Sequence, residues 1–292
     1  MNEIAIVNAI EDMKGFENDR QMFLGYLRAK GRRETTIRTY GEALKTVGKV
    51  MMSLGLPMNA RLLTADAVVM IKDALDVCET SRKLYMIVLG RLTEVLTGAN
   101  IVKEADILWN RAEKRRLFIS VADFKEMMAS CDERERLVMM LGAYMGLRRC
   151  EMCSIRLEDI RGNVLRVKGK GHGEGKIVDV AIPRPVMSAI SSWKAVRPVD
   201  SEWLLPKRDG GKLGTGTIGD IIRRVSGRRG VSMTAHSLRR LYATTLYDVG
   251  TDLDTIRRLM RHNSVETLVE CYLNANPVRK ETAIESLCQV LA

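Results

Sequence analysis

The chain has 292 residues, and because a single domain usually has roughly 100 to 200 residues, two domains are expected. Hydrophobic residues make up 46% of the sequence and charged residues 28%, a globular composition that excludes a disordered chain. The formal net charge of +11 fits a polyanionic partner such as nucleic acid, although many basic proteins bind nothing of the kind.

The six cysteines are scattered along the chain, which indicates reduced thiols rather than a disulfide framework. Cys150 and Cys153 form a single Cys-x-x-Cys pair, and no second pair at metal spacing accompanies it. We therefore expect two small buried side chains on one helix face rather than a zinc site. The longest apolar run, residues 137–147, is too short for a membrane helix, which needs about 20 residues. With no signal peptide recognisable, the sequence predicts a cytoplasmic protein.

Residues 1–105 show helical spacing of apolar residues and no alternation typical of strands, so we expect a compact helical domain. Residues 1–15 form a leader to which no structure is assigned. Thr35 or Thr36 is expected to cap the second helix and Thr64 the third, because a threonine side chain accepts a hydrogen bond from the first helical turn. The four predicted helices span residues 17–30, 36–52, 65–77 and 79–96.

Residues 106–116 are predicted to link this domain to a second one at residues 117–292. The linker carries Arg115 and Arg116. These basic residues are compatible with contacts to a nucleic-acid backbone and equally with a solvated helix end.

The second domain begins with a helical pattern. Ser120 is expected to cap its first helix, and its second, strongly apolar helix stops at Gly146. Arg148 then opens a short helix that carries Glu151. With these two, the longer helices predicted for this domain span residues 121–128, 132–145, 183–195, 217–225, 236–248 and 253–260.

The pattern changes after Leu157 from helical to alternating, which predicts a β-hairpin. Residues 164–168 alternate, residues 169–175 form a glycine-rich turn, and alternation returns over residues 177–182. Lys170 lies at the inner edge of this turn, where it can be presented to a ligand. The spacing of a Walker phosphate-binding loop, and the helix that follows such a loop, are both absent.

Two of the three histidines lie near the end of the chain, each close to an arginine. His236 and Arg239 are three residues apart at a helix start, so they lie on one face and can aim at the same group. Arg261 precedes His262, and Tyr272 follows ten residues later. A guanidinium group presents a planar pair of donors that matches two phosphate oxygens. A tyrosine hydroxyl titrates near pH ~10 and needs an activated phosphate to act as a nucleophile, so this segment predicts phosphate chemistry without a metal.

Six functional positions occur in a fixed order, each in a suitable structural context. They are Arg148 in Gly146-Leu147-Arg148 with Glu151 after it, Lys170 in a Gly-Lys-Gly hairpin, His236 and Arg239 in His-x-x-Arg, His262 and Tyr272. This pattern resembles the tyrosine recombinases of the integrase and Xer type over most of residues 117–275. The resemblance implies a mainly α fold with a small antiparallel β-sheet, in which a helical core DNA-binding domain at residues 1–105 precedes an α+β catalytic domain at residues 117–292. Thr36, Tyr40 and the helix around them look like the core-binding domain of that family.

By this resemblance, Tyr272 is the nucleophile that attacks a DNA phosphodiester and leaves a 3′-phosphotyrosine and a free 5′-hydroxyl. Arg148 and Arg239 are implied to clamp the nonbridging oxygens and to stabilise the charge that builds up in the transition state. The covalent intermediate conserves the bond energy. Religation by the 5′-hydroxyl of another strand is therefore expected to need no ATP, no metal and no other cofactor.

The remaining three positions are implied to handle protons and the phosphate. Lys170 resembles the general acid that protonates the departing 5′-oxygen, while His236 and His262 would hydrogen-bond the phosphate and assist proton transfer.

The sequence departs from the family's usual pattern at three positions without losing a catalytic group. Arg240 stands where a second histidine is common, Ala235 where proline is frequent, and Arg261 where glycine commonly precedes the histidine. Arg261 adds a charge beside the site and leaves the backbone conformation before His262 open. His172, in the glycine-rich turn, is expected to be exposed and neutral to function.

The implied activity is site-specific DNA recombination, by integration, excision or dimer resolution. The implied partners are double-stranded DNA and further copies of the chain, with two protomers per site and a tetramer at synapsis, and accessory DNA-bending proteins are compatible with this scheme. Arg223, Arg224, Arg228 and Arg229, at the end of the helix predicted at residues 217–225, suit contacts to the DNA backbone, and a solvated helix face is the default alternative. The arginines expected to contact DNA are Arg32, Arg33, Arg38, Arg115, Arg116, Arg223 and Arg240.

Two other activities stay open at this point. A type IB topoisomerase-like activity shares the tyrosine chemistry, and the compact size of the chain and the Gly-Lys-Gly hairpin argue against it. A non-catalytic architectural protein would keep the fold alone, and the retention of all six residues argues against it. Tyr242 and Tyr247 are alternative nucleophiles, but both lie in the helix that follows His236 and are expected to pack in the core.

The two ends of the chain bear on the type of enzyme. The short leader before residue 17 favours an Xer-like or plasmid-type enzyme over an integrase with a separate arm-binding domain. The apolar tail at residues 287–291 is compatible with docking on a neighbouring subunit or with folding back.

Overall fold

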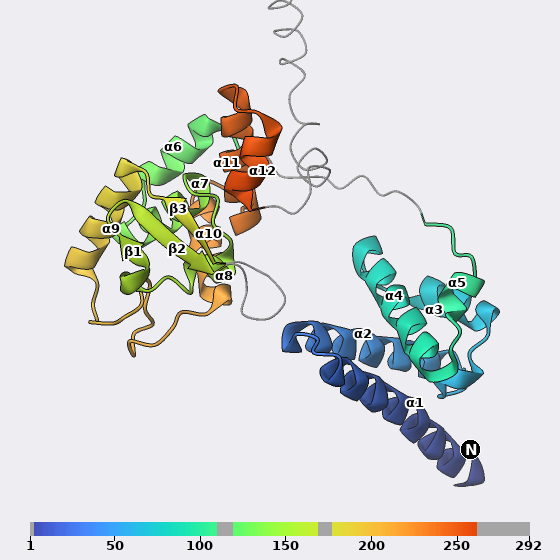
Figure 1. Ribbon diagram of the computed structural model, residues 1–292. Helices are drawn as coiled ribbons and strands as arrows, with labels where there is room; N and C mark the ends of the chain where they lie inside the picture. The colour runs from blue at the N-terminus through green and yellow to red at the C-terminus, as the bar shows by residue number, and fades with distance from the viewer. Residues whose placement is uncertain (1–2, 110–118, 169–176, 262–292) are drawn as a thin grey trace, which may run out of the picture. The chain divides into compact units, whose positions relative to one another are not determined.

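The computed structural model describes residues 3–109, 119–168 and 177–261 (Figure 1). The chain forms two compact units, Met1–Lys114 and Arg115–Ala292, each with its own buried core. Within the described ranges, no helix combines the length and the apolar character needed to cross a lipid bilayer.

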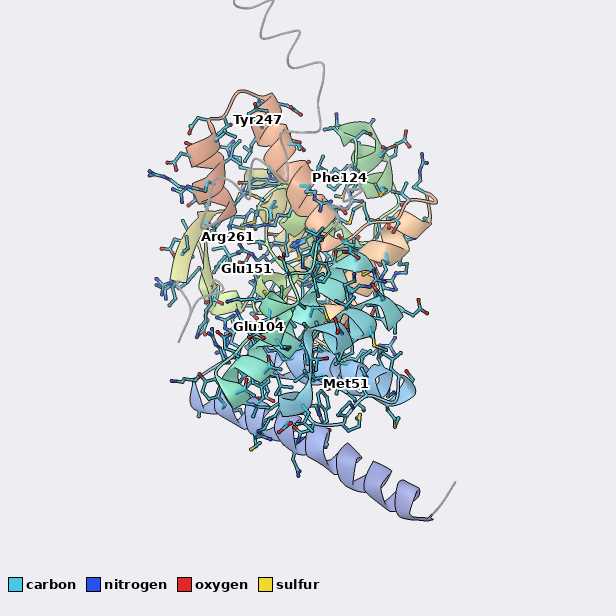
Figure 2. The ribbon with its side chains drawn as sticks, turned by 90° about the vertical axis from the view of Figure 1, so that its right-hand side faces the viewer. Met51, Glu104, Phe124, Glu151, Tyr247 and Arg261 are labelled. Carbon is cyan, nitrogen blue, oxygen red and sulfur yellow. The ribbon has the colours of Figure 1, made fainter. Side chains whose placement is uncertain are left out.

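The first unit is a bundle in which α4 contacts most of the other helices. α4 packs against α1, α2, α3 and α5, and its side chains Leu89 and Leu92 are fully buried. Met51 of α2, labelled in Figure 2, is buried in the same core. The helices are α1 (Glu3–Ala29), α2 (Glu34–Ser53), α3 (Ala65–Ala74), α4 (Glu79–Thr97) and α5 (Ile101–Glu104), with a 3-10 turn at Ala60–Leu62.

Two helix starts in the first unit differ from those predicted. α1 begins at Glu3, so most of the unassigned leader is helical. α2 begins at Glu34 with Arg33 as its N-cap, and no side chain caps it. Thr35 and Thr36 therefore lie inside the first turn rather than before it. Glu34 favours this earlier start because its negative charge lies at the positive end of the helix dipole.

The predicted cap of α3 is confirmed. The side chain of Thr64 accepts a hydrogen bond from the amide of Ala67, at 3.2 Å. The helix nevertheless ends at Ala74 rather than at residue 77, because Leu75 turns to an extended conformation and buries its side chain in the core.

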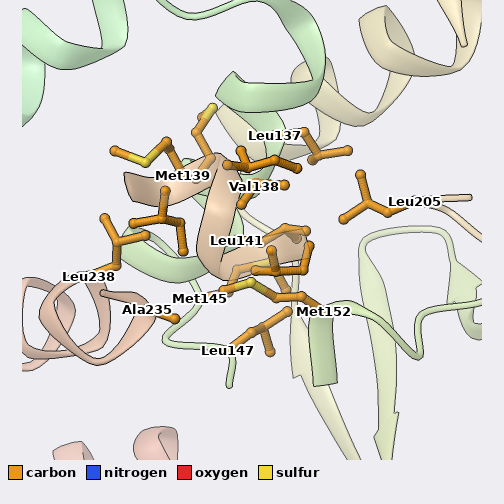
Figure 3. Packing of buried hydrophobic residues seen from close by; sticks show 14 of the residues in the cluster. Leu137, Val138, Met139, Leu141, Met145, Leu147, Met152, Leu205, Ala235 and Leu238 are labelled. Carbon is orange, nitrogen blue, oxygen red and sulfur yellow. The ribbon is translucent and has the colours of Figure 1, made fainter. Parts of the chain in front are cut away.

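The second unit surrounds one helix, α7, whose side chains are buried on nearly every side. α7 packs against α9, α10 and α11, and Figure 3 shows Leu238 and Ala235 of α11 among the side chains of this core. The helices are α6 (Val121–Ala129), α7 (Glu133–Ala143), α8 (Arg149–Met152), α9 (Arg184–Val196), α10 (Thr215–Gly227), α11 (Ala235–Asp248) and α12 (Leu253–Met260). A short 3-10 turn covers Leu157–Asp159.

A glycine allows α11 to approach α7 closely. A Cβ atom added to Gly142 of α7 would lie 2.7 Å from the side chain of Leu238 on α11. Leu238 is fully buried there, so its side chain packs directly on the backbone of α7.

The sheet of the second unit has three antiparallel strands in the order β1-β2-β3. The strands are β1 (Ile160–Arg161), β2 (Val164–Lys168) and β3 (Ile177–Ala181), and Val164 lies opposite Ala181 in the β2–β3 pair. Leu165 and Val167 are buried while Arg166 and Lys168 are exposed, as alternation requires. The predicted fold class, mainly α with a small antiparallel sheet, is confirmed. The sequence missed β1, because two residues are too few to show alternation.

Side chains cap the first two helices of the second unit, and the cap predicted at Ser120 is confirmed. The hydroxyl of Ser120 accepts a hydrogen bond from the amide of Asp123 at 3.0 Å, and Asp132 caps α7 together with Glu135. The expectation that both cysteines of the Cys-x-x-Cys pair are buried was wrong for one of them. Cys153 is buried but Cys150 is exposed, because residues 149 and 150 at the start of α8 face solvent while residues 151–153 turn into the core.

A buried carboxylate joins α7 to α10. Glu135 is only 1% exposed, and its two carboxylate oxygens accept hydrogen bonds from the guanidinium groups of Arg224 and Arg228 at 2.7–3.0 Å. These two arginines were weighed as DNA contacts or as a solvated face. They instead supply the positive charge that the buried carboxylate needs.

Replacing Glu135 by glutamine should lower the free energy of unfolding by about 1–3 kcal/mol, because two arginines lose their buried partner while both remain partly hydrated. The measurement is urea denaturation of the full chain. Asp220→Asn is the matched control, since Asp220 pairs with Arg223 on the exposed face of α10 and should change the value by less than about 0.5 kcal/mol. Equal effects of the two substitutions would contradict a structural role for Glu135.

Candidate active site

Four charged side chains, three arginines and one glutamate, meet where the second unit brings distant segments together. Arg148 and Glu151 come from the start of α8, Arg239 from α11, and Arg261 from the residue that ends α12. α11 and α12 lie side by side (Figure 1), and Figure 2 shows Glu151 near Arg261. We call these four residues the arginine cluster.

The turn after α7 depends on Gly146. Its backbone has a positive φ of +57°, a conformation that residues other than glycine rarely adopt. A Cβ atom here would lie 2.6 Å from the ring of Tyr242. The carbonyl oxygen of Gly146 accepts hydrogen bonds from the guanidinium groups of Arg239 and Arg261. Gly146 therefore fixes the point at which two arginines converge.

Arg239 is buried, with only 2% of its surface exposed. Its Nη1 donates to the carbonyl oxygen of Gly146, and its Nη2 donates to the carbonyl oxygen of Met260 at the end of α12. One guanidinium thus connects α11 to the turn after α7 and to the last turn of α12.

Arg148 is held from two directions. Its Nη1 donates to Oε1 of Glu151 at 2.7 Å, and its Nη2 donates to the carbonyl oxygen of Arg261 at 3.0 Å. The backbone amide of Arg148 donates to the other carboxylate oxygen, Oε2, at 2.8 Å. Because 22% of its side chain stays exposed, Arg148 can still reach a ligand from solvent.

Arg261 ends α12 in the left-handed conformation, with φ +53° and ψ 45°. This is the conformation that glycine would adopt freely, and for a side chain it costs roughly 1–2 kcal/mol. Its Nη2 donates to Oε2 of Glu151 at 2.9 Å and to the carbonyl oxygen of Gly146 at 3.1 Å. Its Nε is buried without a partner among the described residues, a further cost of about 1–3 kcal/mol.

Glu151 is the single carboxylate of the arginine cluster, and its side chain is 1% exposed. Burial raises its pKa, but the charge of Arg261 and the hydrogen bonds from Arg148 outweigh burial and hold the pKa below its usual value. Glu151 is therefore ionised at neutral pH. Three guanidinium groups against one carboxylate leave a positive centre, suited to an oxyanion such as a phosphodiester.

His236 lies beside this positive centre, in the first turn of α11. Its pKa is lowered, first because surrounding protein removes part of the hydration of the ring, and then by the charges of Arg239, Arg240, Arg149 and Arg148. The residue is nevertheless exposed, so its ring remains accessible from solvent. A neutral imidazole at pH 7 can both accept and donate a hydrogen bond.

The structure therefore brings together three of the six predicted catalytic residues, Arg148, His236 and Arg239. The sequence pattern also singled out Glu151 beside Arg148, but the part that Arg261 takes in binding this carboxylate was missed. Only the added charge of Arg261 was visible in the sequence, because its partner is 110 residues away along the chain. Five predicted site residues lie outside the described residues: Arg115, Arg116, Lys170, His262 and Tyr272.

The alternative nucleophiles Tyr242 and Tyr247 are partly buried and pack against a small cluster formed by α11 and α12. Burial raises the pKa of Tyr242, although the charges of Arg261 and Arg239 act in the opposite direction. Among the described residues, no three His, Cys, Asp or Glu side chains form a group that could hold a metal ion.

The remaining predicted DNA contacts lie in different surroundings. Arg32, Arg33 and Arg38 are exposed around the turn between α1 and α2, and Arg32 lines a groove of about 630 Å³ with Lys30 and Arg91. Arg91, which was not among the predicted DNA contacts, donates to the hydroxyl of Tyr40 at 3.0 Å. In the second unit, Arg223 pairs with Asp220, and Arg240 is half-buried on α11.

The sequence model of the phage integrase family matches residues 118–279, which is more than half of the chain. The chain belongs to the phage integrase family. Among its curated relatives, the tyrosine recombinase XerA of Pyrococcus furiosus is 28% identical over 155 residues, 52% of this chain and 54% of that protein. XerA of Pyrococcus horikoshii is 23% identical over 271 residues, 90% of this chain and 91% of that protein. The predicted membership of the tyrosine recombinases is thereby confirmed.

The first of these alignments, like two others with XerA proteins, spans only about half the length of the relative. Solved structures extend the similarity of fold over more of this integrase-family chain. A lambda integrase dimer bound to a COC′ core site matches with a TM-score of 0.71 at 18% identity, covering 87% of this chain and 76% of that one. A XerA recombinase matches with a TM-score of 0.52 at 20% identity, covering 92% and 98%.

Replacing Gly146 by alanine should lower the free energy of unfolding by about 2–4 kcal/mol, because left-handed strain adds to a clash with the ring of Tyr242. Gly162→Ala is the matched control, since Gly162 has the same φ of +57° but no atom within 4 Å of an added Cβ. It should cost only about 1 kcal/mol. If urea denaturation shows equal losses in the free energy of unfolding for the two variants, the clash with the ring of Tyr242 does not contribute and the prediction is wrong.

Replacing His236 by glutamine should make the protein less sensitive to acid. The folded-state pKa of His236 lies below its usual value, so the unfolded chain binds the proton more readily and the free energy of unfolding falls as pH drops below about 6.5. The variant should lose less stability than wild type between about pH 7 and pH 5. Parallel curves of urea midpoint against pH for the two proteins would contradict this.

Proposed function

We propose that this member of the phage integrase family is a site-specific tyrosine recombinase, which cuts and rejoins duplex DNA through a covalent 3′-phosphotyrosine at Tyr272. One observation carries the proposal. Arg148 and Arg239, far apart in the sequence, reach a common cluster beside His236, and both donate to the last carbonyl oxygens of α12. A positive centre of this kind stabilises the charge that develops on a phosphodiester under attack.

The proposed reaction proceeds in two transesterifications. The hydroxyl of Tyr272 attacks the phosphorus atom, a new phosphorus–oxygen bond forms, and the bond to the 5′-oxygen breaks. Lys170 gives a proton to that departing oxygen, while His236 and His262 hydrogen-bond the phosphate and assist the transfer of the proton that leaves the hydroxyl of Tyr272. The 5′-hydroxyl of another strand then attacks the phosphotyrosine and restores the diester without a metal or a nucleotide cofactor.

The two units are proposed to share the binding of DNA. Residues 1–105 would form the core DNA-binding domain, residues 106–116 the linker and residues 117–292 the catalytic domain with its C-terminal tail. The exposed Arg32, Arg33 and Arg38, with the groove beside Arg91, support a phosphate-binding face on the first domain. Contacts of this kind depend strongly on salt. In the catalytic domain, Arg115, Arg116, Arg223 and Arg240 are proposed to add phosphate contacts.

Assembly is proposed to follow the related integrases. Among the related solved structures are a lambda integrase dimer bound to a COC′ core site and a lambda integrase tetramer bound to a Holliday junction. We accordingly propose two protomers per DNA site and a tetramer at synapsis, in the cytoplasm, with accessory DNA-bending proteins as candidate partners. The comparisons do not favour the topoisomerase-like or architectural alternatives.

Covalent capture tests the proposal. Wild type is incubated in EDTA with a pool of nicked suicide duplexes of randomised sequence, and the DNA attached to protein on denaturing gels is sequenced. An adduct is expected for wild type and is expected to vanish in Tyr272→Phe, because the phenyl ring has no hydroxyl to attack phosphorus.

Tyr247→Phe is the matched control, because it removes an alternative tyrosine hydroxyl and should leave the adduct unchanged. An adduct that persists in Tyr272→Phe would assign the nucleophile to another residue. No adduct from wild type on any duplex in the pool would refute the recombinase activity itself.

A further inference from the structure

Arg261 occupies a position where tyrosine recombinases commonly have glycine, and it keeps the left-handed backbone that suits glycine. Its side chain folds back into the arginine cluster and is only 8% exposed. The chain therefore accepts backbone strain at this position and a buried Nε that finds no partner within residues 3–109, 119–168 and 177–261. Neither feature favours folding, so the benefit of Arg261 lies in what its charge and its donors do at the site.

The contacts of Glu151 show what the side chain of Arg261 does in the arginine cluster. Oε1 accepts from Nη1 of Arg148, whereas Oε2 accepts from Nη2 of Arg261 and from the backbone amide of Arg148. A carboxylate with both oxygens available prefers a bidentate pair with one arginine. Because Arg261 occupies Oε2, the pair between Arg148 and Glu151 is limited to one side-chain contact.

The main chain of Arg261 acts in the same direction. Its carbonyl oxygen accepts from Nη2 of Arg148 at 3.0 Å, so the second nitrogen of Arg148 is turned away from Glu151. The charge of Arg261 also favours a positive site. Without Arg261 the cluster would hold two guanidinium groups and one carboxylate, and with Arg261 it holds three guanidinium groups and one carboxylate.

We propose that Arg261 is a positioning residue that takes up one oxygen of Glu151 and thereby leaves Arg148 oriented and charged for the scissile phosphate. This inference rests on the proposed recombinase function. It assigns to Arg261 an effect on the rate of DNA cleavage rather than on the affinity for DNA, because Arg261 reaches Arg148 through Glu151 and through its own backbone.

The test uses the full chain and a duplex that wild type cleaves in the covalent-capture screen. Three substitutions separate the contributions of charge and backbone. Arg261→Met removes the charge and keeps the strain, Arg261→Gly removes both, and Arg261→Lys keeps the charge. Arg258→Met is the matched control, since Arg258 lies on the same helix, is 74% exposed and pairs only with Asp254 among the described residues.

Arg261→Met and Arg261→Gly are expected to slow adduct formation at saturating duplex by about tenfold to a hundredfold, while the dissociation constant for DNA changes by less than about threefold. Arg261→Lys should recover most of the rate, and Arg258→Met should cleave within about twofold of wild type. Circular dichroism of Arg261→Gly should show a folded protein, since glycine relieves the left-handed strain.

Wild-type cleavage rates in Arg261→Met and Arg261→Gly would overturn the inference while leaving the recombinase activity intact. Losses that appear only in DNA affinity, or that are matched by Arg258→Met, would overturn it as well, because they would mark a general effect of charge. Failure of wild type to form any adduct would instead refute the proposed function from which the inference starts.

Discussion

The buried guanidinium of Arg239 is the interaction on which the architecture of the site depends. It donates to the carbonyl oxygens of Gly146 and Met260, which are 93 and 21 residues away along the chain. The last carbonyl groups of a helix have no partner within the helix, and buried carbonyl groups need one. Arg239 meets this need at the end of α12 and at the same time fixes the turn after α7.

Arg148 makes a similar contact with the carbonyl group of the next residue after Met260. Its guanidinium donates to the carbonyl oxygen of Arg261, so both arginines of the proposed phosphate clamp are bound to the C-terminal end of α12. The partial negative charge at that end of the helix attracts both guanidinium groups. As a result, the clamp is complete only when α8, α11 and α12 are all in place. His262 follows directly in the sequence, so the same helix end leads into the next proposed catalytic residue.

Local signals in the sequence predicted the parts of the structure that depend on neighbouring residues. The caps Thr64 and Ser120 and the β2–β3 hairpin follow from side-chain chemistry within a few residues, and each was found. The order of the six positions Arg148, Lys170, His236, Arg239, His262 and Tyr272 also indicated the family, which the family match confirms.

Contacts that depend on tertiary packing were not visible in this way. The ion pairs of Glu135 with Arg224 and Arg228 join residues about 90 positions apart, and so the two arginines were read as surface charges. Arg261 was noted as a departure from the family pattern, but its conformation and its bond to Glu151 depend on where α12 ends against α8. Sequence spacing carries no information on such distances.

The position of Arg239 in the site depends on a contact in the hydrophobic core, between Gly142 and Leu238. Leu238 precedes Arg239 in the chain, so the depth at which its side chain rests on α7 sets how far the guanidinium extends toward the turn after that helix. A side chain at position 142 would lift α11 and withdraw the clamp without touching DNA. In a mutational scan, this apolar position would therefore group with the residues of the arginine cluster rather than with the rest of the core.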